Sequence, residues 1–362
     1  MSRTMVLKNS FFEKKLSALH SQLSTFRIFV LVKSTIQIFS ELGVRLAGFG
    51  SDEVSRSVLA RAVAENEWFS VSDIRYAIEA VRREMLDAER VERWLSRYPL
   101  AGNSDSKRVA VIMAGNIPLV GFFDLMCVLS SGHVPFVKSS SKDSVLEEYV
   151  EQLLRDIEPA LRIEKYVEDA DYDAVIATGG DSANLYFRTV FAGVPRLLRG
   201  SRHSVAVLSG KESKEQIARL ADDIFIHSGL GCRNVSLVFV PKGYKLTLPT
   251  RKMCRAYHNN YLQCKALLTM QSVEFADLGE AVVVKQSQAE FPRFLSQINV
   301  VEYADLDDVK QWLAANDEAL QCVVSDILGL HSRCVEIGQA QSPTLFDYAD
   351  ERDTMQFLAE IG

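Results

Sequence analysis

The chain has 362 residues, too many for one ordinary hydrophobic core, and this length predicts two or three packed units. Hydrophobic residues make up 48% of the chain and charged residues 24%, which is typical of a globular enzyme and argues against a disordered chain. The formal net charge of -6 offers no basic face for phosphates, so we expect no nucleic-acid partner.

The cysteines and the start of the chain bear on metal binding and location. The six cysteines are dispersed, without a CxxC pair or a histidine at zinc-ligand spacing, so we expect no metal site. No secretion signal is evident, and free thiols fit a reducing cytoplasm. The apolar stretch 26–39 is too short and too polar to cross a bilayer, so we expect a cytoplasmic protein without a membrane span.

The first part of the chain has a helical pattern. From residue 11 to about 98, apolar residues recur at intervals of three and four, and Ser72 is a candidate N-cap for the stretch 72–98. A polar break at 101–108 follows. The sequence VAVIMAG at 109–115 then predicts a short buried strand of a parallel sheet, with which a new domain begins.

Strand and helix patterns alternate after this break, which predicts an α/β fold with a parallel sheet covered by helices. The expected strands are 109–114, 133–138, 172–178 and 204–209, and the expected helices are 118–131, 144–158 and 182–191. A helix at 214–225 and a strand at 235–241 follow, and a mixed region with weaker patterns extends to about 329.

Three motifs occur in a suggestive order: AGNIPL at 114–119, VKSSSKDS at 137–144 with IATGGD at 176–181, and HSGLGCRN at 227–234. In this order and spacing they resemble the aldehyde dehydrogenase superfamily. IMAGNIPLVGF at 112–122, SSGHVPFVKSS at 130–140 and the tail at 337–358 resemble its acyl-CoA reductase branch, the LuxC-type fatty acyl reductases. The similarity runs from about residue 67 to the C-terminus.

The resemblance implies an aldehyde-dehydrogenase-like fold with a Rossmann-type cofactor domain and an α/β catalytic domain. We expect a helical region at 1–106 that packs on the cofactor domain, an NAD(P)-binding domain at 107–208 and a catalytic cysteine domain at 209–335. A tail at 336–362 is expected to return to the cofactor side or to form an oligomer contact.

Cys232 falls where the superfamily carries its nucleophile. Attack on a thioester needs an exposed thiolate whose pKa is lowered by nearby donors or positive charge, and Arg233 adds such a charge. Gly229 and Gly231 allow the backbone to approach closely. An arbitrary cysteine is more often a buried apolar residue, which is how we interpret the other five.

Asn116 is expected at the end of the first sheet strand, where an open parallel sheet presents its ligand groups. The resemblance implies that its amide and the backbone N–H of Cys232 hold the substrate oxygen. The alternative is a loop-capping asparagine before Pro118.

The resemblance also implies the cofactor contacts. Lys138 matches the lysine that reaches the adenosine ribose, and Ser141 stands where many NAD-using relatives carry a glutamate. Donors at Ser140 and Ser141 and the absence of that carboxylate favour NADPH. Thr178, Gly179 and Gly180 match the turn beneath the cofactor pyrophosphate, although two glycines in a turn are weak evidence alone.

One expected catalytic group is missing. Superfamily members that oxidise aldehydes to acids carry a glutamate that activates water, whereas Leu198 occupies that place in LLRGSRHS at 197–204. An acyl-enzyme that is not hydrolysed can instead accept hydride. His227 is a candidate acid near Cys232, although a lone histidine at a helix edge is more often structural.

The resemblance therefore implies an NADPH-dependent reductase of an acyl-CoA or acyl carrier protein thioester that forms an acyl-enzyme on a cysteine and releases an aldehyde. An aldehyde dehydrogenase, an acyl-phosphate reductase and a non-catalytic, acyl-transferring scaffold remain alternatives. The superfamily also implies a homo-oligomer.

Overall fold

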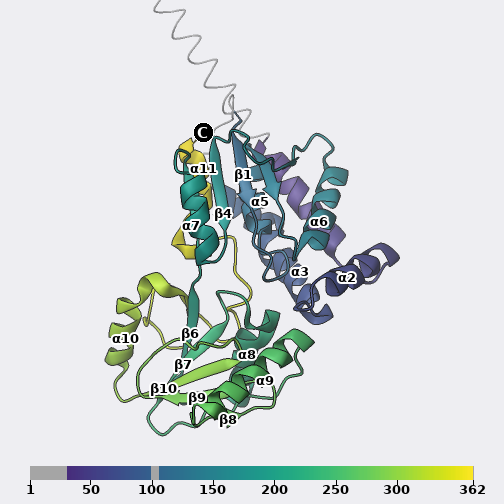
Figure 1. The fold of residues 1–362 in the computed structure, drawn as a ribbon. Coiled ribbons are helices and arrows are strands. Elements are labelled where there is room, and N and C mark those ends of the chain that lie inside the picture. The colour runs from purple at the N-terminus through teal and green to yellow at the C-terminus, as the bar shows by residue number, and fades with distance from the viewer. Residues whose placement is uncertain (1–30, 99–105, 362) are drawn as a thin grey trace, which may run out of the picture.

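The computed structural model describes residues 31–98 and 106–361. The beginning of the expected helical region and most of the expected polar break at 101–108 lie outside the described residues. Two sheets with their helices make up most of the rest, one above the other in Figure 1.

Helices precede the first sheet. Residues 31–46 are helical, followed by α2 (Glu53–Glu65), α3 (Val71–Met85) and α4 (Ala88–Leu95). The sequence suggested Ser72 as the N-cap of α3, and this prediction is wrong, because the helix begins at Val71. Ser70 has the extended backbone of a cap, and its side chain accepts the backbone N–H of Asp73. Phe39, Ile74 and Trp94 of these helices are buried in one core with the first sheet.

The first sheet has five parallel strands in the order β3-β2-β1-β4-β5. Their bounds are β1 (Arg108–Ile112), β2 (Val134–Lys138), β3 (Glu164–Lys165), β4 (Ala174–Thr178) and β5 (Arg196–Arg199). The chain moves outward from β1 to β3 and then returns to the other side of β1 at β4. In doubly wound sheets, ligands bind at the carboxyl ends of the strands at such a switch point.

Both faces of this sheet are covered. Alternate residues of β1 face opposite sides, so Val109 and Val111 join the core that contains α5 (Phe122–Ser130) and α6 (Ser144–Ile157). Ala110 and Ile112 pack on the other side, in the core that contains Phe187 of α7 (Asp181–Val190). The helix expected from residue 118 begins at Phe122, because Leu119 has a left-handed φ of 56° that interrupts it.

The second sheet has seven strands in the order β12-β11-β6-β7-β10-β9-β8, parallel except for the pairing of β8 with β9. Their bounds are β6 (His203–Val207), β7 (Val235–Pro241), β8 (Ala276–Asp277), β9 (Val282–Gln286), β10 (Gln297–Tyr303), β11 (Leu320–Val324) and β12 (Cys334–Val335).

This topology corrects one expected boundary. Strand β6 was expected at the end of the unit that closes at residue 208, but it pairs with β7 and β11 of the second sheet. The chain therefore crosses between the sheets at residues 200–202. Helices α8 (Lys214–Phe225) and α9 (Arg255–Met270) pack on one face of the second sheet, and α10 (Leu306–Ala315) packs on the other. The α/β class expected from the alternating pattern is confirmed.

The tail returns from the second sheet to the first, as the yellow segment of Figure 1 shows. It ends in α11 (Thr354–Ile361), whose Met355 and Leu358 are buried in the core with α5. Arg199 at the end of β5 fixes this helix: its guanidinium lies 2.5 Å from Asp124 Oδ2 of α5 and donates to Thr354 Oγ1 at 2.6 Å.

This tether predicts a stability effect. Arg199 is 3% exposed and Asp124 7% exposed, so Asp124→Ala leaves a buried charge without its partner. We expect the free energy of unfolding in urea to fall by about 3–5 kcal/mol. As a control, Glu79→Ala breaks the surface pair with Arg82 and should cost less than about 1 kcal/mol. Equal losses in the two variants would contradict a buried ionic tether.

Candidate active site between the two sheets

Asn116 lies in the turn after β1, at the carboxyl edge of the first sheet near its switch point. The turn is fixed by the buried carboxylate of Asp143, whose Oδ2 accepts the backbone N–H of Leu119 at 2.6 Å. It also packs closely on the loop after β2, because a Cβ atom on Gly115 would lie 2.4 Å from Ser140 Oγ. Asn116 is therefore held next to the loop that carries the expected cofactor residues.

The loop after β2 carries Lys138, Ser140 and Ser141. Lys138 is exposed, with its Nζ 5.1 Å from the ring centroid of Tyr166, and Ser141 is also exposed. The nearby Glu147 of α6 is 5% exposed, and burial raises the pKa of its carboxyl to about 8. This carboxyl is therefore mostly neutral at pH 7, and the exposed side of the loop carries hydroxyls and a lysine.

Thr178, Gly179 and Gly180 lie between β4 and α7, on the other side of the switch point. Gly180 is the N-cap of α7 and has no side chain that could accept a hydrogen bond from the first N–H groups of this helix. A Cβ on Gly179 would lie 2.9 Å from Ala183 Cβ, so only glycine fits this close approach. Both features suit a phosphate group next to the backbone.

Cys232 lies in the turn just before β7 of the second sheet, and the turn meets Asn116. The side-chain amide of Asn116 donates to the carbonyl of Leu230 at 2.7 Å. Ser204 at the start of β6 donates to the carbonyl of Cys232 at 2.8 Å, which fixes the cysteine from its own sheet. The structure thus brings together the two residues that the motifs predict to act on one substrate oxygen.

Cys232 differs from the other cysteines in exposure. All six are described, and Cys232 alone is exposed; Cys127, Cys264 and Cys322 are buried, and Cys254 and Cys334 are half-buried. Its pKa differs from the expectation, however. Although the residue reaches solvent, the protein atoms packed around it desolvate the thiol and raise its pKa to about 11, and the opposing effect of Arg233 is smaller. The thiol is therefore protonated at neutral pH in this state.

His227 is not arranged as an acid. It is 5% exposed, has a left-handed φ of 57° and donates its backbone N–H to Asp73 Oδ1 at 3.0 Å. Burial lowers the pKa of its imidazole to about 4. A neutral, buried ring whose edge lies against Tyr76 favours the structural interpretation of this histidine.

The tail contributes residues that the sequence did not indicate as part of the site. The side chain of Asp350 is 9% exposed and pairs with Arg202 Nε at 3.1 Å. The negative charge of Asp350 makes a small contribution to the raised pKa of Cys232, after those of burial and of Cys322. Leu198 is buried in β5 as an apolar residue. The carboxylate that acts on the thiol thus comes from a residue about 150 positions after Leu198, and no motif around Cys232 could have indicated it.

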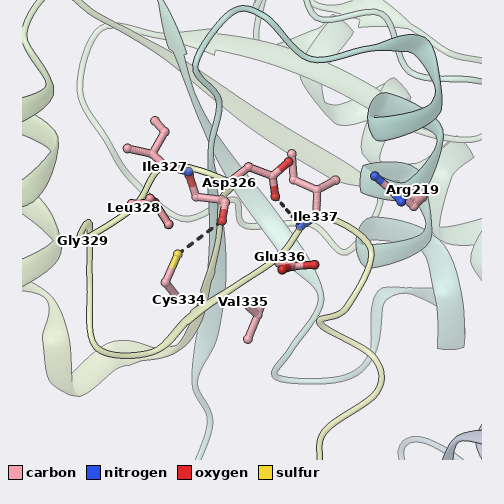
Figure 2. Close-up of a pocket in the computed structure, with 10 residues that line it drawn as sticks. Arg219, Asp326, Ile327, Leu328, Gly329, Cys334, Val335, Glu336 and Ile337 are labelled. Carbon is pink, nitrogen blue, oxygen red and sulfur yellow. Dashed lines mark hydrogen bonds between the residues drawn. The ribbon is translucent and has the colours of Figure 1, made fainter.

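A cavity of about 430 Å³ lies elsewhere on the second sheet (Figure 2). It is lined by the segment that follows β11 and by β12, where the Cys334 thiol donates to the Ser325 carbonyl at 3.4 Å. These residues follow β11, whereas Cys232 precedes β7. Strand β6 pairs in parallel with both β7 and β11, so all three strands run in the same direction. The cavity therefore lies at the carboxyl ends of these strands and Cys232 at their amino ends. The cavity therefore forms no part of the site around Cys232.

Comparison with known proteins identifies the family. A model described as acyl-CoA reductase (LuxC) matches residues 77–256, which include Asn116, Lys138 and Cys232. This part of the chain belongs to the acyl-CoA reductase (LuxC) family. The resemblance predicted from the motifs is thereby confirmed, and the family is one of acyl-reductase and aldehyde-dehydrogenase chemistry. No curated protein matches the chain in sequence.

Solved structures show that this chain has the aldehyde dehydrogenase fold. Aldehyde dehydrogenase 21 from Physcomitrella patens, in complex with its reaction product succinate, superposes with a TM-score of 0.65 at 10% identity, over 91% of this chain and 84% of that one. The His387Ala mutant of the propionaldehyde dehydrogenase from the Clostridium phytofermentans fucose utilisation microcompartment gives 0.57 at 9% identity, over 89% and 85%. An aldehyde dehydrogenase from Bacillus cereus in complex with NAD+ gives 0.56 at 12% identity, over 81% and 71%.

Two further properties concern the described part of the chain. Within residues 31–98 and 106–361, no helix is long and apolar enough to span a membrane. Among the same residues, no group of three or more His, Cys, Asp or Glu side chains is arranged to hold a metal ion.

The raised pKa of Cys232 predicts how its reactivity depends on pH. Because the thiolate is the reactive form and the pKa is about 11, alkylation by iodoacetamide should rise about 10-fold per pH unit from pH 7 to pH 10 without a plateau. Mass spectrometry of the Cys232 peptide measures this rate, with a free cysteine peptide as the control that levels off earlier. A plateau near pH 7–8 would mean that the thiol is already activated in the unliganded protein.

Proposed function

We propose that this protein reduces a fatty acyl thioester to an aldehyde with NADPH, through an acyl-enzyme on Cys232. The observation that carries the proposal is the hydrogen bond from Asn116 to the Leu230 carbonyl, which joins the first sheet to the cysteine turn. One N–H of the Asn116 amide is used in this bond, which leaves the second for a substrate oxygen, and the backbone N–H of Cys232 lies beside its own thiol. Two donors next to an exposed thiol are what a thioester carbonyl needs when it becomes an oxyanion.

The acyl transfer step uses groups of this chain. Cys232 Sγ attacks the thioester carbonyl while the two donors hold the carbonyl oxygen. As the tetrahedral species collapses, the carrier leaves as a thiol that takes the proton which Cys232 gives up, so no net proton is consumed. The same donors would hold the oxygen again when the acyl-enzyme is reduced by hydride. Departure of the aldehyde breaks the C–S bond and releases Cys232 as a thiolate, which takes one proton from solvent to regenerate the thiol.

A nicotinamide cofactor supplies the hydride in this chemistry. Residues on both sides of the switch point fit such a cofactor: Thr178, Gly179 and Gly180 offer a close backbone approach for the pyrophosphate, and Lys138, Ser140 and Ser141 offer donors for the adenosine end. Next to the loop after β2, the raised pKa of Glu147 keeps its carboxyl mostly neutral at pH 7. The Asp143 carboxyl of the loop is buried against the Leu119 N–H, so the exposed side of the loop offers hydroxyls and a lysine to a 2′-phosphate. This supports NADPH over NADH.

Reduction is favoured over hydrolysis of the acyl-enzyme. Leu198 offers no base where oxidising relatives have glutamate, and Asp350 is paired with Arg202. An aldehyde dehydrogenase that uses Asp350 as its base is the second candidate, because this carboxylate lies close enough to affect the Cys232 thiol. The two differ in product, since the hydrolytic enzyme releases an acid.

We also propose a homo-oligomer in the cytoplasm, with acyl-CoA or an acyl carrier protein as the thioester donor. The support for an oligomer is an apolar stretch on the outer side of α7, where Leu185, Tyr186 and Val190 are each at least half exposed. We further propose that the first sheet and the helices around it bind the cofactor, and that the second sheet carries the catalytic cysteine.

Replacement of the nucleophile tests the function. Cys232→Ala should abolish aldehyde formation from octanoyl-CoA and NADPH and also covalent labelling by radioactive octanoyl-CoA. Cys127→Ala and Cys264→Ala are the controls, because both side chains are buried away from solvent and should leave labelling intact. Labelling that survives in Cys232→Ala would reject the assignment of the nucleophile, and octanoate as the main wild-type product would favour the hydrolytic candidate.

Asn116→Ala tests the oxyanion donors. Loss of one preorganised donor typically slows turnover by ~10²–10³, and we expect this effect in kcat with little change in octanoyl-CoA binding. Steady-state kinetics separate the two parameters. Unchanged turnover would mean that Asn116 only caps its loop.

Ser141→Glu tests the preference for NADPH. A carboxylate at this exposed position would repel the 2′-phosphate by roughly 1–2 kcal/mol after solvent screening, or about 10-fold in affinity. The ratio of NADPH to NADH efficiency should therefore fall, while kcat at saturating cofactor changes little. The exposed Ser272, outside the first sheet, provides a control as Ser272→Glu. An unchanged ratio in Ser141→Glu would show that the adenosine end lies elsewhere.

A further inference from the structure

Three consecutive residues that lead to Cys232 have left-handed backbones. His227, Ser228 and Gly229 have φ values of 57°, 54° and 67°. This region is unfavourable for residues that carry a Cβ atom, so the surrounding contacts must hold the segment in place. The segment connects the end of α8 to the cysteine turn, and its neighbours identify the contact that holds it.

Asn234, two residues after Cys232, bridges these two parts. Its side chain is 5% exposed. The amide Nδ2 lies 3.2 Å from the carbonyl oxygen of Asp223, 3.1 Å from that of Ile224 and 2.9 Å from that of Ile226. These carbonyls belong to the last turn of α8 and its C-cap, where helices leave acceptors without partners. The two hydrogens of the amide are thus shared among three acceptors.

The other end of Asn234 holds the cysteine turn. Its Oδ1 accepts the backbone N–H of Gly231 at 2.8 Å, and its own backbone N–H donates to the Gly231 carbonyl at 3.0 Å. Gly231 and Asn234 thus close a four-residue turn from both ends, with Cys232 and Arg233 as its central residues. The N–H of Gly231 is used in this contact, so Asn234 fixes the turn without using the N–H of Cys232.

The orientation of the amide is determined by these partners. Exchanging its oxygen and nitrogen would place an oxygen against three carbonyl oxygens and an NH₂ group against the Gly231 N–H. An ionised aspartate has no donor for the α8 carbonyls, and a serine or threonine hydroxyl has a single oxygen where the amide has a donor and an acceptor on separate atoms.

We propose that Asn234 is a positioning residue that holds the Cys232 thiol and its backbone N–H in the geometry for acyl transfer. The inference rests on the proposed function, in which that N–H and Asn116 hold the substrate oxygen. Asn234 acts through Gly231 and the end of α8 and does not contact the substrate. A small displacement of the turn would misalign both the nucleophile and one donor, and such errors typically cost ~10²-fold in rate.

The test compares two reactions of the same thiol. In Asn234→Ala, acylation of Cys232 by octanoyl-CoA should slow by ~10–100-fold, mainly in the limiting rate and with less than about 3-fold change in half-saturation. Alkylation by iodoacetamide needs no oxyanion donors, so it should stay within about 3-fold of wild type or increase. Asn234→Asp keeps the acceptor for Gly231 but places its second oxygen against the three carbonyls of α8, so it should not restore the acylation rate.

Asn299→Ala is the matched control. Asn299 is a buried asparagine of the same sheet that donates to the Glu290 carbonyl at 2.8 Å. It should lose stability without a selective loss of acylation. If Asn234→Ala does not fold, Asn234→Ser is used, since its hydroxyl is too short to join α8 to Gly231. Acylation within about 3-fold of wild type, parallel losses in both reactions, or the same loss in Asn299→Ala would overturn the inference.

Amide hydrogen exchange separates this inference from the proposed function. The peptide that spans 227–234 should exchange faster in Asn234→Ala than in wild type or Asn299→Ala, whatever the substrate. Unchanged exchange would contradict the role of Asn234. If wild-type Cys232 is not acylated by octanoyl-CoA although the exchange result holds, the proposed function fails and the structural part of the inference stands.

Discussion

The candidate site depends on one hydrogen bond between the sheets, from the Asn116 amide to the Leu230 carbonyl. Each partner is held within its own sheet: the turn of Asn116 through Asp143 and Leu119, and the turn of Cys232 through Ser204. Because neither side relies on a long flexible loop, the contact fixes how the carboxyl edge of one sheet faces the cysteine of the other. Residues from two sheets can act on one substrate only if the relative position of the sheets is fixed.

The tail strengthens the same relation. The carboxylate of Asp223 in α8 accepts the backbone N–H groups of Gly338 and Ala340 at 2.6 and 3.0 Å, which fixes the tail on the second sheet. At the other end, Thr354 accepts from the buried Arg199 of the first sheet. A segment that is hydrogen-bonded to both sheets restricts their relative movement. Between these two contacts it carries Asp350, which pairs with Arg202 and whose charge acts on the Cys232 thiol. Burial of Asp223 raises its pKa to about 7, whereas the two N–H donors act in the opposite direction.

The sequence predicted the regular elements well where local patterns are strong. Helix α8 and strand β7 have the predicted bounds, because a capping box at Ser213 and a run of apolar residues before Pro241 are local features. The assignment of β6 to the wrong sheet has a nonlocal cause. Its pattern equals that of the strands before it, and its partners β7 and β11 lie about 30 and 115 residues further along the chain.

The site was predictable only in part for the same reason. Motifs identified Asn116 and Cys232, and the structure brings their turns together. The left-handed backbone of the consecutive residues His227 and Ser228 follows from tertiary contacts, since residues other than glycine rarely adopt it. The pKa of Cys232 is another such property: Arg233 next to it suggested an activated thiol, but the packing around the thiol has the larger effect. The unliganded thiol is therefore mostly protonated at neutral pH.

Intact mass measurement with ordered additions tests the central claim most directly. Protein mixed with octanoyl-CoA alone should gain one octanoyl group, located on Cys232 by peptide analysis. When NADPH is then added after removal of free octanoyl-CoA, the adduct should disappear in step with the appearance of octanal. An adduct on another residue, no adduct at all, or release of octanoate that does not require NADPH would contradict the account.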